Sequence, residues 1–170
     1  MKLIPSLVAN TRIDKARKAS YKGIKYRMGH GGTDPDDDLP TKDNYCDCSG
    51  FAAWTMGLNR APKKDRPFWI ETTAIVRDAL GLRKAFTRLL NPEPGCYAVY
   101  GDTAFRQGHI LLVTEVSKDG RLTCIDCSSG SGGKKKESIR EWDRTSLIYD
   151  KKAIFVTLRQ DIKHLGGQLP

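Results

Sequence analysis

Cys48 stands where a polar segment turns apolar, a position in which a thiol could act as a nucleophile. The segment 44–54 opens with polar and small residues, and Phe51 and Trp54 then follow at helical spacing. Asp47 suits a helix N-cap, which places Cys48 in the first helical turn. Unpaired N–H groups and the positive end of the helix dipole stabilise a thiolate there, so the pKa of such a cysteine falls. The ordinary alternative is a helix that happens to begin with cysteines.

A thiolate nucleophile needs a general base, and the base needs a group that orients it. His109–Val116 is the longest strand-like run, and Leu122–Cys127 follows it after a short turn, which predicts a β-hairpin. Strand alternation then places Asp126 on the side of His109, where a carboxylate would fix the imidazole tautomer and stabilise the imidazolium. A register slip of one residue would turn Asp126 away. The alternative for His109 is an ordinary histidine at a strand end.

Other polar residues are weaker candidates. His30 lies in a Gly-rich loop, and we interpret it as a loop or substrate-side residue. The acidic residues at 34–38 lack the spacing of a Ca²⁺ loop, so we interpret them as solvated. Four thiols, in the segments 46–48 and 124–127, could form a structural zinc site, although Cys-x-Cys departs from the usual spacing. We expect no metal and no cofactor. Gly50 is expected to let a substrate approach the sulfur closely.

The segment 47–51, Asp-Cys-Ser-Gly-Phe, resembles the D-C-S-G-F signature of the NlpC/P60 family of papain-like cysteine peptidases. Three further segments match that family in the same order. They are the tyrosine at the start of 26–29, the Gly-His that opens the apolar strand at 108–113, and the polar residue within 124–128. The resemblance therefore covers about residues 26–128.

The resemblance implies a fold, an activity and a set of site residues. It implies a papain-like α+β fold, with the cysteine helix packed on an antiparallel sheet of about five to six strands. It also implies a peptidoglycan endopeptidase that cuts the stem peptide, at the γ-D-glutamyl-diamino acid bond. Its catalytic residues would be Cys48, His109 and Asp126. Its substrate-binding residues would be Tyr26, Asp47 and Ser49.

Two positions depart from the family pattern. Many relatives carry His, and some Asn or Gln, where this chain has Asp126. The family often has Gly-Asp where this chain has Gly95 and Cys96. Two alternatives stay open: another papain-like enzyme, such as an amidase, an acyltransferase or a deamidating toxin, and a non-enzymatic zinc-binding domain.

The elements that must position these residues follow from periodicity and turn chemistry. A capping-box-like start at Thr11 and a stop at Gly23 predict a basic first helix whose charged face, including Arg12, is solvated. After the Cys48 helix, a third helix is expected from Phe68 to Leu80. Helices first and strands afterwards indicate an α+β protein. Further strands are expected at 96–100 and 153–159, a basic loop at 128–136 and an unstructured tail at 160–170, all within one domain, 1–170.

Composition limits the kinds of partner and the cellular compartment that we expect. The net charge of +9 and the pI of about 9.4 indicate an anionic partner, for which nucleic acid and the bacterial wall with its acidic polymers are both candidates. No nucleic-acid motif accompanies the charge, and charge alone does not choose between them, although with the family resemblance we expect the wall and no nucleic acid. We expect no membrane insertion, no signal peptide at the N-terminus, and a monomer. Five cysteines cannot all pair internally, so synthesis in a reducing bacterial or phage-infected cytoplasm is expected. Action at the cell wall or in the periplasm then requires non-Sec delivery, by a phage or a secretion system, and an effector would have an immunity protein.

Overall fold

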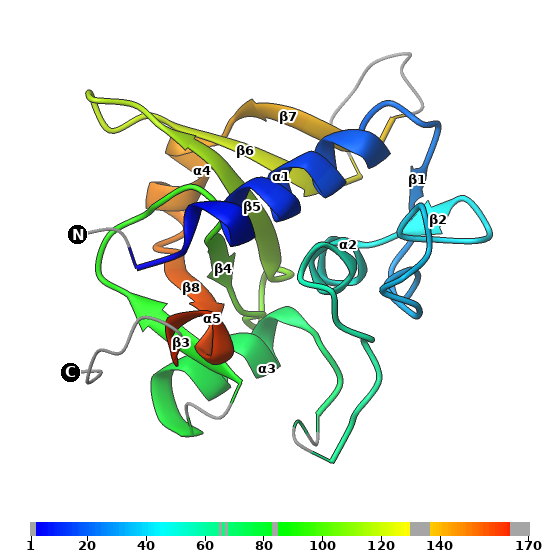
Figure 1. Cartoon of the computed structure of the whole chain (residues 1–170), viewed down its shortest axis with the longest axis horizontal. Helices are drawn as coiled ribbons and strands as arrows, with labels where there is room; N and C mark the ends of the chain where they lie inside the picture. The colour runs from blue at the N-terminus through cyan, green and yellow to red at the C-terminus, as the bar shows by residue number, and fades with distance from the viewer. Residues whose placement is uncertain (1–2, 65, 67, 83–84, 130–136, 164–170) are drawn as a thin grey trace.

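A computed structural model of the chain describes residues 3–64, 66, 68–82, 85–129 and 137–163 (Figure 1). Its centre is a six-stranded antiparallel sheet with the strand order β3-β8-β4-β5-β6-β7. The strands are β3 (Phe86–Leu89), β4 (Tyr97–Tyr100), β5 (His109–Val116), β6 (Leu122–Cys127), β7 (Ile139–Asp143) and β8 (Ile154–Leu158). A short parallel pair, β1 (Lys25–Tyr26) with β2 (Tyr45–Cys46), forms a separate sheet. The predicted α+β class with an antiparallel sheet is confirmed.

Apolar side chains of β5 and β6 alternate between the two faces of the sheet, so each face carries its own core. One core joins Ile110, Leu112 and Ile125 to α2 (Cys48–Thr55). Residues of α1 (Ser6–Ala19) join the same core, and Figure 1 shows α1 crossing in front of β5 and β6. The other core contains Leu111, Val113, Cys124 and, from α4 (Thr145–Asp150), Ile148.

The β5–β6 hairpin forms with the predicted boundaries. Leu112 pairs with Ile125, so His109 and Asp126 lie on the same face of the sheet in diagonal positions. The irregularity in this ladder falls between Val113 and Glu115, at the far end from His109. The predicted juxtaposition of His109 and Asp126 therefore depends on an unbroken stretch of register, and it is confirmed.

The predicted bounds of the first helix are wrong at both ends. The helix begins at Ser6, five residues before Thr11, whose hydroxyl donates to the Leu7 carbonyl at 2.8 Å inside the helix. A helical Thr commonly makes this back-bond instead of capping. The helix ends at Ala19, before Gly23.

Arg12 is also not solvated as expected. Its side chain is buried and makes an ion pair with Asp161 at 2.7 Å, together with hydrogen bonds to the Gly95 carbonyl and the Thr157 hydroxyl. Asp161 lies in α5 (Arg159–Lys163), a helix in the tail that was predicted to be unstructured. A long-range carboxylate partner decides the burial of Arg12, and its sequence neighbours give no sign of that partner.

The helix predicted from Phe68 to Leu80 is shorter than its apolar pattern. Helix α3 (Thr72–Arg77) begins where the Glu71 carboxylate accepts the N–H groups of Thr73 and Ala74, at 2.9 and 2.6 Å, and a π-helical turn (Asp78–Leu82) follows it. Phe68 and Trp69 therefore lie outside the helix. Positions 130–136 of the predicted basic loop and 164–170 of the tail lie outside the described residues.

Candidate active site

The start of α2 holds Cys48 in the position that its sequence predicts. Asp47 has extended backbone geometry, and its carboxylate accepts the Gly50 N–H at 2.7 Å and the Ser49 hydroxyl at 3.2 Å. It is therefore the N-cap, and Cys48 is the first residue of the helix. The thiol is buried, at the end of the helix where the backbone favours negative charge.

His109 links Cys48 to Asp126. The His109 Nε2 lies 2.6 Å from the Asp126 Oδ2, and Cys48 lies near enough to the ring to contribute to the pKa of His109. Because Nε2 is engaged by the carboxylate, Nδ1 is the nitrogen left for the sulfur. Burial alone would lower the pKa of His109, but the hydrogen bond to Asp126 and the interaction with Cys48 raise it to about 9. The arrangement can hold an imidazolium beside a thiolate.

Asp126 is fully buried and receives two further donors. The Trp142 Nε1 donates to Oδ1 at 2.6 Å, and the Arg144 Nη2 donates to Oδ2 at 2.6 Å. Burial raises the pKa of Asp126, but the hydrogen bonds and the positive charges of His109 and Arg144 outweigh burial and lower it. The carboxylate therefore stays ionised behind the histidine.

Asp47 and Ser49 are both buried, and both contact a buried arginine that sequence reasoning missed. The Arg60 Nη2 lies 2.8 Å from the Asp47 Oδ2 and 2.7 Å from the Ser49 hydroxyl. Arg60 also donates to the carbonyls of Ile70 and His30. Its side chain therefore connects the start of α2 to the loops on either side of that helix. The carboxylate and the hydroxyl are thus engaged within the protein, and a role in substrate binding stays a prediction.

Gly50 serves a different purpose from the one expected. A Cβ at this position would lie 2.4 Å from the His30 carbonyl oxygen and 2.8 Å from that of Gly31. The glycine therefore makes room for the loop that precedes the cysteine, and the expectation that it makes room for substrate is wrong. His30 itself pairs with Asp43 at 2.9 Å, as a loop residue.

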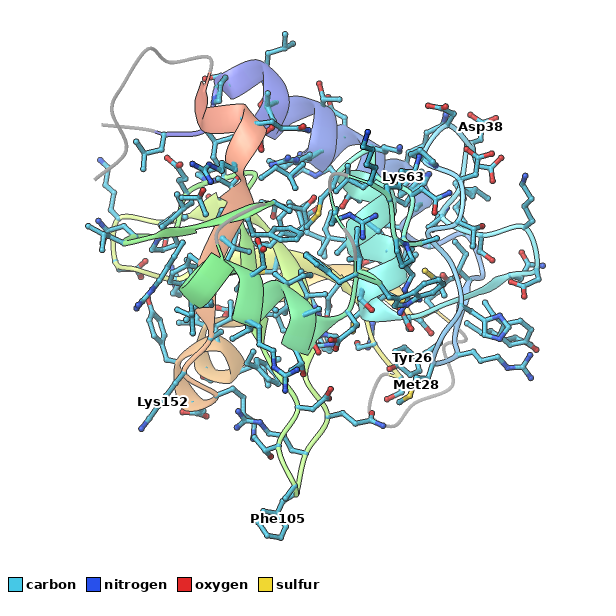
Figure 2. The ribbon with its side chains drawn as sticks, turned by 90° about the horizontal axis from the view of Figure 1, so that it is seen from below. Tyr26, Met28, Asp38, Lys63, Phe105 and Lys152 are labelled. Atoms are coloured by element: carbon cyan, nitrogen blue, oxygen red, sulfur yellow. The ribbon has the colours of Figure 1, made fainter. Side chains whose placement is uncertain are left out.

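Tyr26 lies near Cys48 and lines the same cavity as His109. It pairs with Cys46 in the β1–β2 ladder, which brings it close to Cys48, and both burial and the neighbouring Cys48 raise the pKa of its hydroxyl. Tyr26 and His109 line one cavity of about 280 Å³. The rest of its lining comes from Tyr100, Gln107, Gly108, Ser128, Ser129, Trp142, Arg144 and Leu147. Figure 2 shows Tyr26 beside Met28 and, at the tip of the loop that precedes His109, an outward-pointing Phe105.

The four thiols of the zinc alternative do not converge. Cys124 packs in the core on one face of the sheet, whereas Cys46, Cys48 and Cys127 pack in the core on the other. Among the described residues, no group of three His, Cys, Asp or Glu side chains could hold a metal ion. Burial raises the pKa of Cys96 to about 12, so that thiol is not a second nucleophile.

Comparison with known proteins gives only distant structural similarity. Neither the models of known protein families nor the curated proteins match this chain. Among solved structures, the chain is similar to the crystal structure of Ly7917, at 15% sequence identity and a TM-score of 0.45. The similarity covers 88% of this chain and 62% of that one, so this chain spans less than two thirds of its length. Similarity at this level carries no argument about activity. Within the described residues, no helix is long and apolar enough to cross a membrane.

Proposed function

We propose that this protein is a papain-like cysteine hydrolase of the NlpC/P60 type that cuts peptide bonds in the peptidoglycan stem. One observation carries the proposal: the His109 imidazole is hydrogen-bonded to the buried Asp126 carboxylate at 2.6 Å, with Cys48 near enough to help raise its pKa. A buried thiol at a helix start, next to a histidine whose pKa is raised, is typical of a catalytic cysteine–histidine pair. Cys48 is the nucleophile, His109 the proton carrier and Asp126 the orienting carboxylate.

The reaction proceeds in two halves. The Cys48 thiolate attacks the scissile carbonyl carbon, and the resulting oxyanion accepts the Cys48 backbone N–H and a neighbouring donor. As the C–N bond breaks, the His109 imidazolium gives its proton to the leaving amine, and a thioester remains. Water then loses a proton to His109 and attacks the thioester, which releases the carboxylate product and the thiol. Asp126 holds the imidazole in the tautomer that both halves require.

The choice of substrate rests on the resemblance and on charge. The signature at 47–51 is typical of enzymes that cut the γ-D-glutamyl-diamino acid bond, and the net charge of +9 suits an anionic wall. Tyr26 lines the cavity beside His109, where its hydroxyl could hold a substrate amine or the oxyanion. On this account the enzyme acts at the wall or in the periplasm, as a phage product or a secreted effector, and an effector of this kind would have an immunity protein.

Another papain-like amidase, acyltransferase or deamidating toxin is the second candidate. The same triad would serve it, because these enzymes share the thioester and differ in the acyl donor and the acceptor. The non-enzymatic zinc domain is not favoured, because Cys124 faces away from the other three thiols.

Digestion of purified peptidoglycan, with mass analysis of the released fragments, tests the proposal. We expect new free amino groups on the diamino acid and no new reducing sugar ends. Cys48→Ala should abolish the release of fragments with the fold intact. Cys46→Ala is the matched control, since that thiol is buried and donates to the Asp47 carbonyl at 3.3 Å, and it should retain most activity. New reducing ends alone, or equal loss in both variants, would contradict the proposal.

A further inference from the structure

The Asp126 carboxylate, which contacts His109, also accepts hydrogen bonds from Arg144 and Trp142. Arg144 donates to Oδ2 of Asp126, the same oxygen that contacts His109, and Trp142 donates to Oδ1, each at 2.6 Å. Both residues come from β7 and its end, on the strand that pairs with Asp126. Arg144 also reaches the Ser128 hydroxyl at 3.4 Å.

Two guanidinium groups, those of Arg140 and Arg144, lie against the Trp142 ring. The Arg144 Cζ lies 3.5 Å from the ring centroid, and the Arg140 Cζ lies 4.3 Å from it. Within the described part of the chain, Arg144 donates to the Asp126 carboxylate, whereas Arg140 stacks on the indole. A planar guanidinium held against an aromatic ring loses little further freedom when it binds a carboxylate.

The charges of the site balance only when Arg144 is included. A thiolate at Cys48, an imidazolium at His109 and a carboxylate at Asp126 sum to one net negative charge. The side chains of His109 and Asp126 are 12% and 0% exposed, so water does little to offset that charge. The guanidinium of Arg144, 16% exposed, brings the sum to zero.

We propose that Arg144 is a positioning residue that neutralises Asp126 and thereby allows Cys48 to ionise, while Trp142 fixes the second carboxylate oxygen. The inference rests on the proposed function, because it assigns these residues a role in the same site. Loss of the Arg144 charge leaves the site with a net negative charge, which makes the Cys48 thiolate harder to form.

Charged and titratable groups on several elements surround the site formed by Cys48, His109 and Asp126. They are Cys48 on α2, Tyr26 on β1, Tyr100 on β4, Asp126 and Cys127 on β6, Arg144 after β7, and Arg106 in the loop before His109. Arg106 lies 4.9 Å from the Tyr100 ring centroid, so its charge is directed at that ring. Arg144 is hydrogen-bonded to the carboxylate itself, and for this reason its removal should have the larger effect on ionisation of the thiol.

The rate of Cys48 alkylation by iodoacetamide, followed against pH by peptide mapping, measures this ionisation without any substrate. We expect Arg144→Gln to move the acid-side midpoint up by about one pH unit, which is a tenfold loss of thiolate below the midpoint. Arg144→Lys should keep the midpoint near that of the wild type because it keeps the charge. Arg140→Gln is the matched control: it removes a cation from the same tryptophan and should leave the midpoint unchanged.

A second variant separates charge balance from a merely structural role. Asp126→Asn combined with Arg144→Gln removes one negative and one positive charge, so the midpoint should return toward the wild-type value. This double variant also leaves no unpaired buried charge, which keeps the test valid if Arg144→Gln alone fails to fold. An unchanged midpoint in Arg144→Gln, an equal shift in Arg140→Gln, or a larger shift in the double variant would overturn the proposal. Failure to digest peptidoglycan leaves this readout intact, so the two proposals fail separately.

Discussion

Asp126 is a charged residue with no exposed surface, and its three donors show what keeps it ionised. Asp126→Asn keeps the size and one acceptor oxygen but removes the charge that favours the thiolate–imidazolium pair. We expect hydrolysis to fall by about 10 to 1000-fold, less than in Cys48→Ala, because the parts of a catalytic unit are not additive. Asp126→Ala should fall further. Asp119→Asn, an exposed carboxylate in the β5–β6 turn, is the control and should be neutral. Full activity in Asp126→Ala would show that the Cys48–His109 pair suffices.

The raised pKa of His109 leads to predictions about how hydrolysis and stability depend on pH. Hydrolysis should fall as the pH rises past about 9, because the imidazolium that protonates the leaving amine loses its own proton. Stability follows the same group. A histidine whose pKa is near 6.5 when unfolded and about 9 when folded adds stability that is complete below pH 6.5 and is lost as the pH rises through 9.

Urea unfolding of the wild type and of His109→Gln, between pH 6 and pH 10, measures the stability effect. The difference in unfolding free energy between the two proteins should shrink as the pH rises. A constant difference would show that protonated His109 is not specifically stabilised by Asp126 and Cys48.

At the scale of elements, α2 and the loop before it meet through two glycines. A Cβ at Gly50 would lie 2.4 Å from the His30 carbonyl, and a Cβ at Gly32 would lie 2.4 Å from the Gly50 carbonyl. These are backbone contacts, which cannot move aside as a flexible side chain can. Gly50→Ala should therefore destabilise the protein by about 1–3 kcal/mol and lower activity by shifting Cys48.

Thermal unfolding of Gly50→Ala beside Gly81→Ala measures this effect. Gly81 also lies in a helical segment, and a Cβ there meets nothing within 4 Å, so its substitution should be neutral or slightly stabilising. Equal melting temperatures for Gly50→Ala and the wild type would show that the loop before α2 shifts to accommodate the added methyl group.

The sequence predicts those elements whose signals are local. Alternation and a turn are enough to place β5 and β6 and to bring Asp126 beside His109, and the N-cap at Asp47 is enough to start α2. The start of α1 was missed because Pro5, which precedes the helix, makes no side-chain cap. The strands β3 and β7 were missed because their faces are only partly apolar, with polar residues throughout β7.

Arg60, Trp142 and Arg144 were missed for a different reason. Each acts through a partner far along the chain: Arg60 on Asp47, and the other two on Asp126. The spacing of residues along the sequence does not indicate such long-range pairs. The alternation at Arg140, Trp142 and Arg144 is the available signal, since it indicates three side chains on one face of a strand.

At the scale of the whole molecule, the net charge of +9 makes a prediction about wall binding. Cys48→Ala should bind intact peptidoglycan that carries anionic polymers, and binding should weaken as NaCl rises from about 50 to 500 mM because salt screens exposed charges. Sedimentation of the protein with wall fragments measures it. Fragments stripped of their anionic polymers are the control and should bind less. Binding that is insensitive to both changes would show that charge does not guide the protein to the wall.

The most direct measurement of the central claim is covalent capture by a stem peptide that carries an electrophile in place of the scissile carbonyl. It tests the nucleophile and the substrate together. Intact mass should show one equivalent bound, and peptide mapping should place it on Cys48. Capture should be absent in Cys48→Ala, slow in His109→Ala, and weak for the same electrophile on a scrambled peptide. Capture at another cysteine, or equal capture by the scrambled peptide, would contradict the account.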